Sequence, residues 1–89
     1  MKLDAIREKI DALDEKILYL LQNRFKSVEE VRELKKTLGL PVEDKKREEE
    51  VLNNLLLMGK KLGLSKSFVT HLFKLIISES KKIQIFNEY

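Results

Sequence analysis

Four basic residues are placed so that their side chains could face a helical core or its margin: Arg7, Arg24, Lys35 and Arg47. Arg24 is the most informative, because it occupies a core position of a seven-residue apolar repeat, between Ile17 and Val31. A guanidinium in a helical core is costly unless an anionic group pairs with it. The sequence therefore predicts either a site for an anion or a structural ion pair at Arg24.

Two further segments offer polar groups that could complete such a site. Asp44, Arg47 and Glu48 stand together, so the candidate set holds four cations but only two acids. Arginine forks match carboxylates or phosphates, and several cations together favour a small ligand with two anionic groups. Ser80 and Gln84, four residues apart in an apolar segment, place two hydrogen-bonding groups on one helical surface.

The residues needed for several other chemistries are missing from this pattern. The chain has no Cys, and its single histidine, His71, lies away from the line through Ser80 and Gln84. We find no Ser-His-Asp spacing and no cluster typical of a metal site. If the protein is an enzyme, we expect it to use no metal and no cofactor, and to act by positioning and electrostatic complementarity.

Three helices are expected to position these groups, which makes the fold all-α. The first, at about residues 3–38, carries the seven-residue repeat and ends before Gly39 and Pro41. The second, about 45–61, is capped by Asp44, and the third, about 67–87, is capped by Ser65 or Ser67. The Phe and Met residues fall at helical spacing and are expected in the core.

The first helix is too long for a compact monomer. Its 36 residues would extend about 54 Å, whereas a compact chain of 89 residues has a radius of gyration of about 12 Å. The other two helices, folded back, would leave much of the apolar seam exposed. We therefore expect an intertwined homodimer with antiparallel long helices, in which Arg7 approaches the half of the partner that holds Arg24 and Lys35.

The length of 89 residues suggests a single domain, residues 1–89. Net charge is +3, but acids are interleaved with the basic residues. The basic pairs, including Lys81-Lys82, are therefore interpreted as solvated surface and not as a nucleic-acid site, with Lys35 and Arg47 as the exceptions. The charged start of the chain has no signal-peptide core, and no apolar run is long enough for a membrane span. We expect a cytoplasmic protein that contacts neither nucleic acid nor membrane.

The spacing of these residues resembles that of the AroQ-class chorismate mutases, which are all-helical. The resemblance covers essentially the whole chain and rests on the combination of all matching positions, not on any one of them. The matching positions are Leu3, Arg7, Ile10, Asp11, Leu13, Asp14, Ile17, Leu20, Leu21, Arg24, Val31, Lys35, Pro41, Val42, Asp44, Arg47, Glu48, Ile76, Ile77, Ser80 and Gln84.

The resemblance implies an enzyme that converts chorismate to prephenate by a Claisen rearrangement, on the shikimate route to Phe and Tyr. It implies that Arg24, with Arg7 of the neighbouring chain, clamps the two carboxylates of the substrate. It also implies that Lys35 and Gln84 donate hydrogen bonds to the ether oxygen, where negative charge grows as the C–O bond breaks.

The same resemblance gives roles to the remaining polar residues. Glu48 would accept a hydrogen bond from the substrate hydroxyl, helped by the backbone near Asp44, while Arg47 and Ser80 would complete the polar wall. Two alternatives stay open: an isochorismate pyruvate-lyase of the same fold, and a non-catalytic helical dimerisation or regulatory module whose arginines merely pair with acids.

Overall fold

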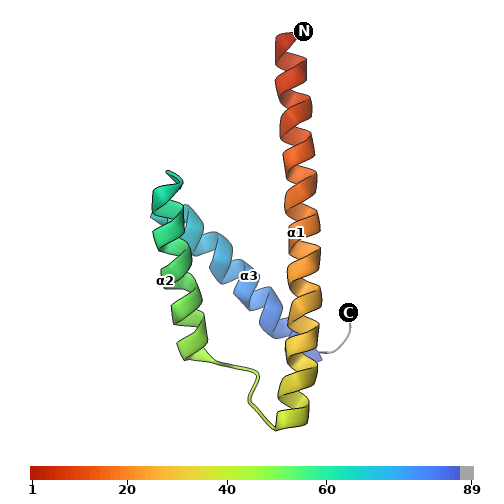
Figure 1. Ribbon diagram of the computed structural model, residues 1–89, viewed down its shortest axis with the longest axis vertical. Helices are drawn as coiled ribbons and strands as arrows, with labels where there is room; N and C mark the ends of the chain where they lie inside the picture. Colours follow the sequence, from red (N-terminus) through yellow and green to blue (C-terminus); the bar gives the residue numbers. More distant parts are fainter. Residues whose placement is uncertain (87–89) are drawn as a thin grey trace.

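The computed structural model describes residues 1–86, and within them all regular structure is helical. Three helices follow one another: α1 (Lys2–Leu38), α2 (Lys45–Lys61) and α3 (Lys66–Phe86) (Figure 1). The all-α, three-helix class predicted from the sequence is confirmed. The first and third helices begin one residue earlier than expected, and the expected end of the third, Asn87, lies outside the described residues.

The helix ends are set by local chemistry. Gly39 follows α1 in the left-handed conformation, with φ of 69°, which a residue without Cβ adopts at little cost. Asp44 caps α2 by accepting a hydrogen bond of 3.0 Å from the backbone N–H of Arg47. Of the two serines considered for α3, Ser65 is the cap, since its Oγ accepts from the N–H of Phe68 at 3.0 Å.

The third helix is the centre of the packing. It packs against both α1 and α2, whereas within the described residues α1 and α2 do not pack against each other. The buried apolar side chains of the described chain recur every seven residues along α3, at Val69, Ile76 and Ile83. Gly59 of α2 is buried against this face. A Cβ at this position would lie only 3.0 Å from Cγ2 of Val69. The missing side chain lets α2 and α3 approach closely.

The N-terminal half of α1 extends away from the other two helices (Figure 1). The chain measures 57 × 28 × 15 Å, and its radius of gyration is 16.2 Å, against about 12 Å for a compact domain of this length. No residue of α1 is buried. In this half, the seam side chains are each about half exposed: Leu3 47%, Ile6 51%, Ile10 50%, Leu13 51% and Ile17 54%. A single chain therefore leaves its apolar seam uncovered.

The Phe and Met residues expected in the core are only partly covered by the single chain. Phe25 and Phe73 are half-buried, whereas Met1, Met58 and Phe68 are 91%, 58% and 55% exposed. The side chain of Phe86 lies outside the described part of the chain. The burial of the exposed members in a dimer stays a prediction.

None of the helices in the described part of the chain combines the length and the hydropathy that a membrane crossing requires. The cytoplasmic location stays a prediction.

Candidate anion-binding site

A cavity of about 170 Å³ lies where the C-terminal half of α1, the start of α2 and the C-terminal half of α3 meet. Its apolar wall consists of Val28, Val31, Val42, Val51 and Ile77. Its polar lining consists of Arg24, Lys35, Asp44, Arg47, Glu48, Ser80, Lys81 and Gln84. The fold thus brings together seven of the eight residues that the sequence singled out, and adds Lys81.

Arg24 crosses from α1 to α3. Its Nη1 donates a hydrogen bond of 2.6 Å to Oγ of Ser80, and the Ser80 hydroxyl donates in turn to the carbonyl of Ile76 at 2.8 Å. Ser80 is only 6% exposed. Burial, and then the nearby charge of Arg47, lower the pKa of Arg24. Within residues 1–86 no carboxylate pairs with Arg24, so the structural ion pair considered for it is not found there.

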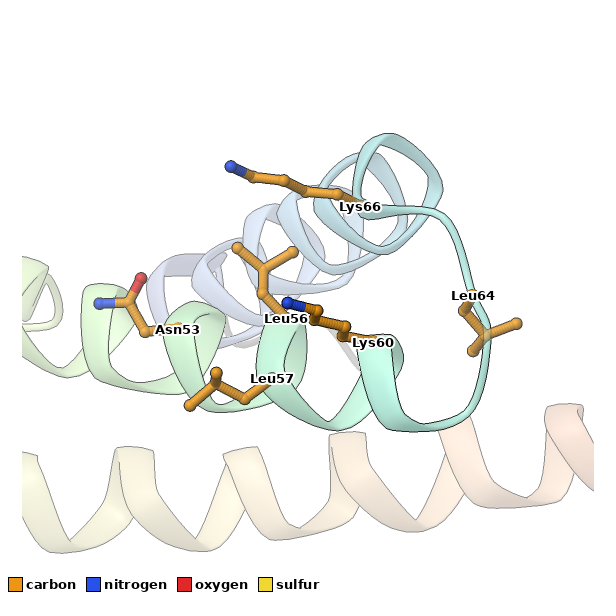
Figure 2. Close-up of a pocket in the computed structure, with 6 residues that line it drawn as sticks. All are labelled: Asn53, Leu56, Leu57, Lys60, Leu64 and Lys66. Carbon is orange, nitrogen blue, oxygen red and sulfur yellow. The ribbon is translucent and has the colours of Figure 1, made fainter.

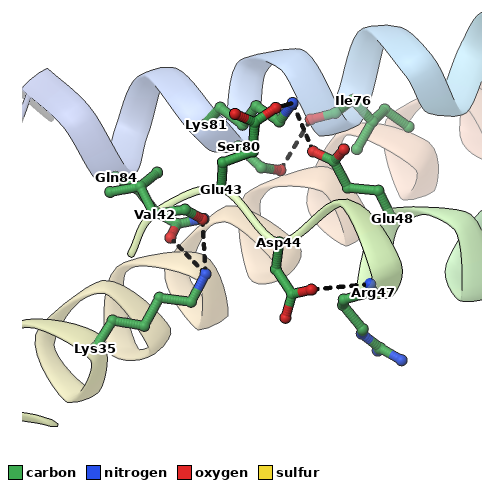
Figure 3. A network of polar contacts seen from close by, with 10 residues as sticks. All are labelled: Lys35, Val42, Glu43, Asp44, Arg47, Glu48, Ile76, Ser80, Lys81 and Gln84. Carbon is green, nitrogen blue, oxygen red and sulfur yellow. Dashed lines mark hydrogen bonds and ion pairs between the residues drawn. The ribbon is translucent and has the colours of Figure 1, made fainter. Parts of the chain in front are cut away.

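Lys35 joins α1 to two other segments (Figure 3). Its Nζ donates to the carbonyl of Val42, in the connection between α1 and α2, at 2.8 Å, and to Oε1 of Gln84, on α3, at 3.3 Å. Both acceptors are uncharged oxygens, so no carboxylate offsets the positive charge of Lys35 at the cavity. Because Lys35 occupies the amide oxygen of Gln84, the amide nitrogen is the group that remains to donate to a ligand.

The first turn of α2 forms another edge of the cavity. Asp44 uses one carboxylate oxygen as the helix cap, on the backbone of Arg47, and the Arg47 side chain is exposed at the cavity margin. The N-terminus of a helix attracts anions through its unpaired N–H groups and its dipole. In this structure the Asp44 carboxylate occupies that position, and Arg47 supplies the positive side chain of this edge.

Lys81 is a site residue that the sequence analysis missed. Its Nζ lies 2.6 Å from Oε1 of Glu48 and 3.4 Å from Oε1 of Glu43 (Figure 3). The hydrogen bond to Glu48 is the main cause of a raised pKa for Lys81. The sequence analysis interpreted Lys81-Lys82 as solvated surface; Lys82 is 57% exposed, whereas Lys81 is 33% exposed and also lines the cavity. The available signal was its place beside Ser80 and three residues before Gln84.

The charges of the lining are not balanced. Four cations, Arg24, Lys35, Arg47 and Lys81, face two acids, Asp44 and Glu48, which leaves a net charge of +2 around the cavity. This charge suits a small organic ligand that carries two negative groups.

Arg7 is the one predicted site residue that does not line this cavity. It lies 17 positions before Arg24 on the same helix, which corresponds to about 26 Å along the axis. That separation exceeds the reach of an arginine side chain. Within one chain Arg7 cannot contact a ligand bound beside Arg24.

Comparison with known proteins gives consistent matches along most of the chain. Residues 6–85 match the family model described as chorismate mutase type II. The bifunctional chorismate mutase/prephenate dehydratase of Escherichia coli (strain K12) is 45% identical over 76 residues, which cover 85% of this chain and 20% of that protein. The chorismate mutase of Methanocaldococcus jannaschii is 32% identical over 83 residues, which cover 93% of this chain and 84% of that protein.

A bifunctional protein of the same description from Aquifex aeolicus is 31% identical over 91 residues, covering 94% of this chain and 25% of that protein. The chain therefore spans about a fifth to a quarter of the length of these bifunctional relatives, and most of the length of the archaeal one.

Proposed function

Because the chain belongs to the chorismate mutase type II family, we propose that it catalyses the rearrangement of chorismate to prephenate, a step toward Phe and Tyr. The observation that carries the proposal is the cavity of net charge +2, in which Arg24 and Lys35 have only neutral hydrogen-bond partners. Chorismate is a dianion, so its carboxylates supply the charge that these cations lack. We further propose that residues 1–89 form one such domain.

The rearrangement is an intramolecular Claisen reaction, so the protein needs to orient one molecule and stabilise one developing charge. We assign the carboxylates of the substrate to Arg24 and to Arg7 of a second chain. Lys35 and the amide N–H of Gln84 donate to the ether oxygen as the C–O bond breaks. Orientation and preorganised donors of this kind suffice for about 8 kcal/mol of barrier lowering.

The remaining polar residues bind the other groups of the substrate. We assign the substrate hydroxyl to Glu48, whose side chain enters the cavity from α2, together with the backbone near Asp44. Arg47 and Ser80 complete the wall, and Ser80 also holds Arg24 in place. In this scheme no side chain forms a covalent bond to the substrate.

We propose that the active form is a homodimer with antiparallel α1 helices. The half-exposed seam from Leu3 to Ile17 supports this, because a second copy of the same seam covers it. If two α1 helices pair about their common midpoint, position 7 of one lies opposite position 33 of the other. Arg7 then stands between Arg24 and Lys35 of its partner, which is where the single chain lacks a carboxylate clamp.

A second hollow is consistent with the same assembly. It has a volume of about 570 Å³ and lies between the last turns of α2 and the beginning of α3 (Figure 2), lined by Asn53, Leu56, Leu57, Lys60, Leu64 and Lys66. Leu57 and Leu64 are 64% and 48% exposed. We propose that the partner chain covers this apolar surface, and that the hollow is not a ligand site.

The test is to follow the loss of chorismate absorbance with the purified protein and with Arg24→Ala. Lys26→Ala is a matched control, since Lys26 is exposed two residues further along the same helix. Turnover that is lost in the Arg24 variant alone, with folding retained, supports the proposal. A folded protein that leaves chorismate unchanged contradicts it, and formation of salicylate and pyruvate from isochorismate would identify the lyase instead.

A further inference from the structure

Lys81 of α3 and Glu48 of α2 form an ion pair. Nζ of Lys81 lies 2.6 Å from Oε1 of Glu48, and both residues line the cavity. The Glu48 side chain is 26% exposed and that of Lys81 is 33% exposed, so the pair is partly shielded from water. Such a pair is stronger and better fixed than one between fully exposed side chains.

The geometry divides the two oxygens of the Glu48 carboxylate between two tasks. Lys81 occupies Oε1 from α3, and the other oxygen remains to accept a hydrogen bond from a ligand in the cavity. Glu48 is a flexible side chain in the first turn of α2. Without a partner on α3 it would have to be ordered each time a ligand binds, at an entropic cost.

The second contact of Lys81 supports the same arrangement. Its Nζ also lies 3.4 Å from Oε1 of Glu43, in the connection that Lys35 holds through the carbonyl of Val42. Figure 3 shows Lys81 reaching from α3 toward both acids. Glu43 is 55% exposed and does not line this cavity, so it holds the lysine from outside while Glu48 meets it from inside.

We propose that Lys81 is a positioning residue for the rearrangement: it fixes one oxygen of Glu48 on α3, so that the other oxygen is aimed at the substrate hydroxyl. This inference rests on the proposed function, because it assumes that Glu48 accepts from that hydroxyl. It differs from a direct role, in which the ammonium group would bind an anionic group of the substrate without needing Glu48.

A double-mutant cycle separates the two roles. Lys81→Met is expected to lower kcat/KM by about tenfold, whereas in a Glu48→Gln background the same change should cost less than about twofold, because there is no carboxylate left to position. Lys81→Arg should recover kcat/KM to within about threefold of the unaltered protein. Equal losses in both backgrounds, or no recovery by arginine, would overturn the proposal.

Lys82→Met is the matched control. Lys82 is the next residue, its ion pair with Glu79 is long at 3.8 Å, and it lines no part of this cavity. Its kcat/KM should stay near that of the unaltered protein, and circular dichroism should show both methionine variants folded at the assay temperature. A folded Lys81→Met protein that loses no more kcat/KM than the control would contradict positioning.

A readout without turnover distinguishes failure of this inference from failure of the proposed function. The ¹³C NMR signal of the Glu48 carboxyl carbon should shift in Lys81→Met and stay in place in Lys82→Met. An unchanged signal in both variants overturns the pairing itself. If the signal shifts in Lys81→Met but the unaltered protein does not convert chorismate, the Lys81–Glu48 pairing is supported and the proposed function is contradicted.

Discussion

Arg24 and Ser80 are 56 positions apart in the chain and are joined by a hydrogen bond of 2.6 Å. This contact joins α1 to α3. It also orients the guanidinium without neutralising it, because a hydroxyl is an uncharged acceptor. The charge of Arg24 is therefore held in place for an anion from outside the chain.

Replacing Ser80 with alanine should loosen Arg24 and leave the fold intact. We expect the KM for chorismate to rise about fivefold, because the guanidinium loses the acceptor that orients it. The free energy of unfolding should change by less than about 1 kcal/mol, since the Ser80 hydroxyl otherwise bonds only the backbone of its own helix. Ser78→Ala, an exposed position on α3, is the control, and an equal rise in KM there would refute the role of Ser80.

Mixing two inactive variants tests whether Arg7 works in the partner chain. Arg7→Ala and Arg24→Ala should each lose turnover as pure homodimers. After unfolding and refolding together, half of the dimers contain one chain of each kind, and one of the two sites in such a dimer is intact. The mixture should recover about a quarter of the unaltered activity. No recovery, with mixed dimers verified by mass spectrometry, would place Arg7 outside the site.

Replacing Asp44 separates its capping role from its charge. Asp44→Ala removes the acceptor for the Arg47 N–H and should lower the free energy of unfolding by about 1 kcal/mol. Asp44→Asn keeps a cap, so its stability should stay within a few tenths of a kcal/mol, measured by urea unfolding at one protein concentration. If both variants lose the same stability, the negative charge and not the hydrogen bond is responsible.

Because Gln84 has an amide side chain that does not titrate, the proposed reaction should not depend on pH. The amide donates to the ether oxygen at any pH, so kcat/KM should be nearly constant around neutrality. In Gln84→Glu the side chain donates only when protonated, and an unperturbed glutamate has a pKa of about 4.3. Activity of this variant should therefore rise as the pH falls. A pH profile identical to that of the unaltered protein would remove Gln84 from the ether oxygen.

The sequence by itself determined the three helices and most of the site. The apolar repeat set the length of α1, and Gly39, Asp44 and Ser65 set the helix ends through short-range hydrogen bonds. These signals are readable because each depends on residues within about four positions of one another. Arg24 was identifiable for a related reason, since a cation on a core step breaks the repeat that surrounds it.

Only the tertiary structure decided how the pieces meet. Lys81 appears in the sequence as half of a basic pair, and its partner Glu48 lies 33 positions earlier on another helix. No local period records such a contact, because it depends on the crossing of α2 and α3 at Gly59 and Val69. The position of Arg7 also became clear only in three dimensions. Because α1 is one continuous helix, Arg7 lies far from the cavity of its own chain.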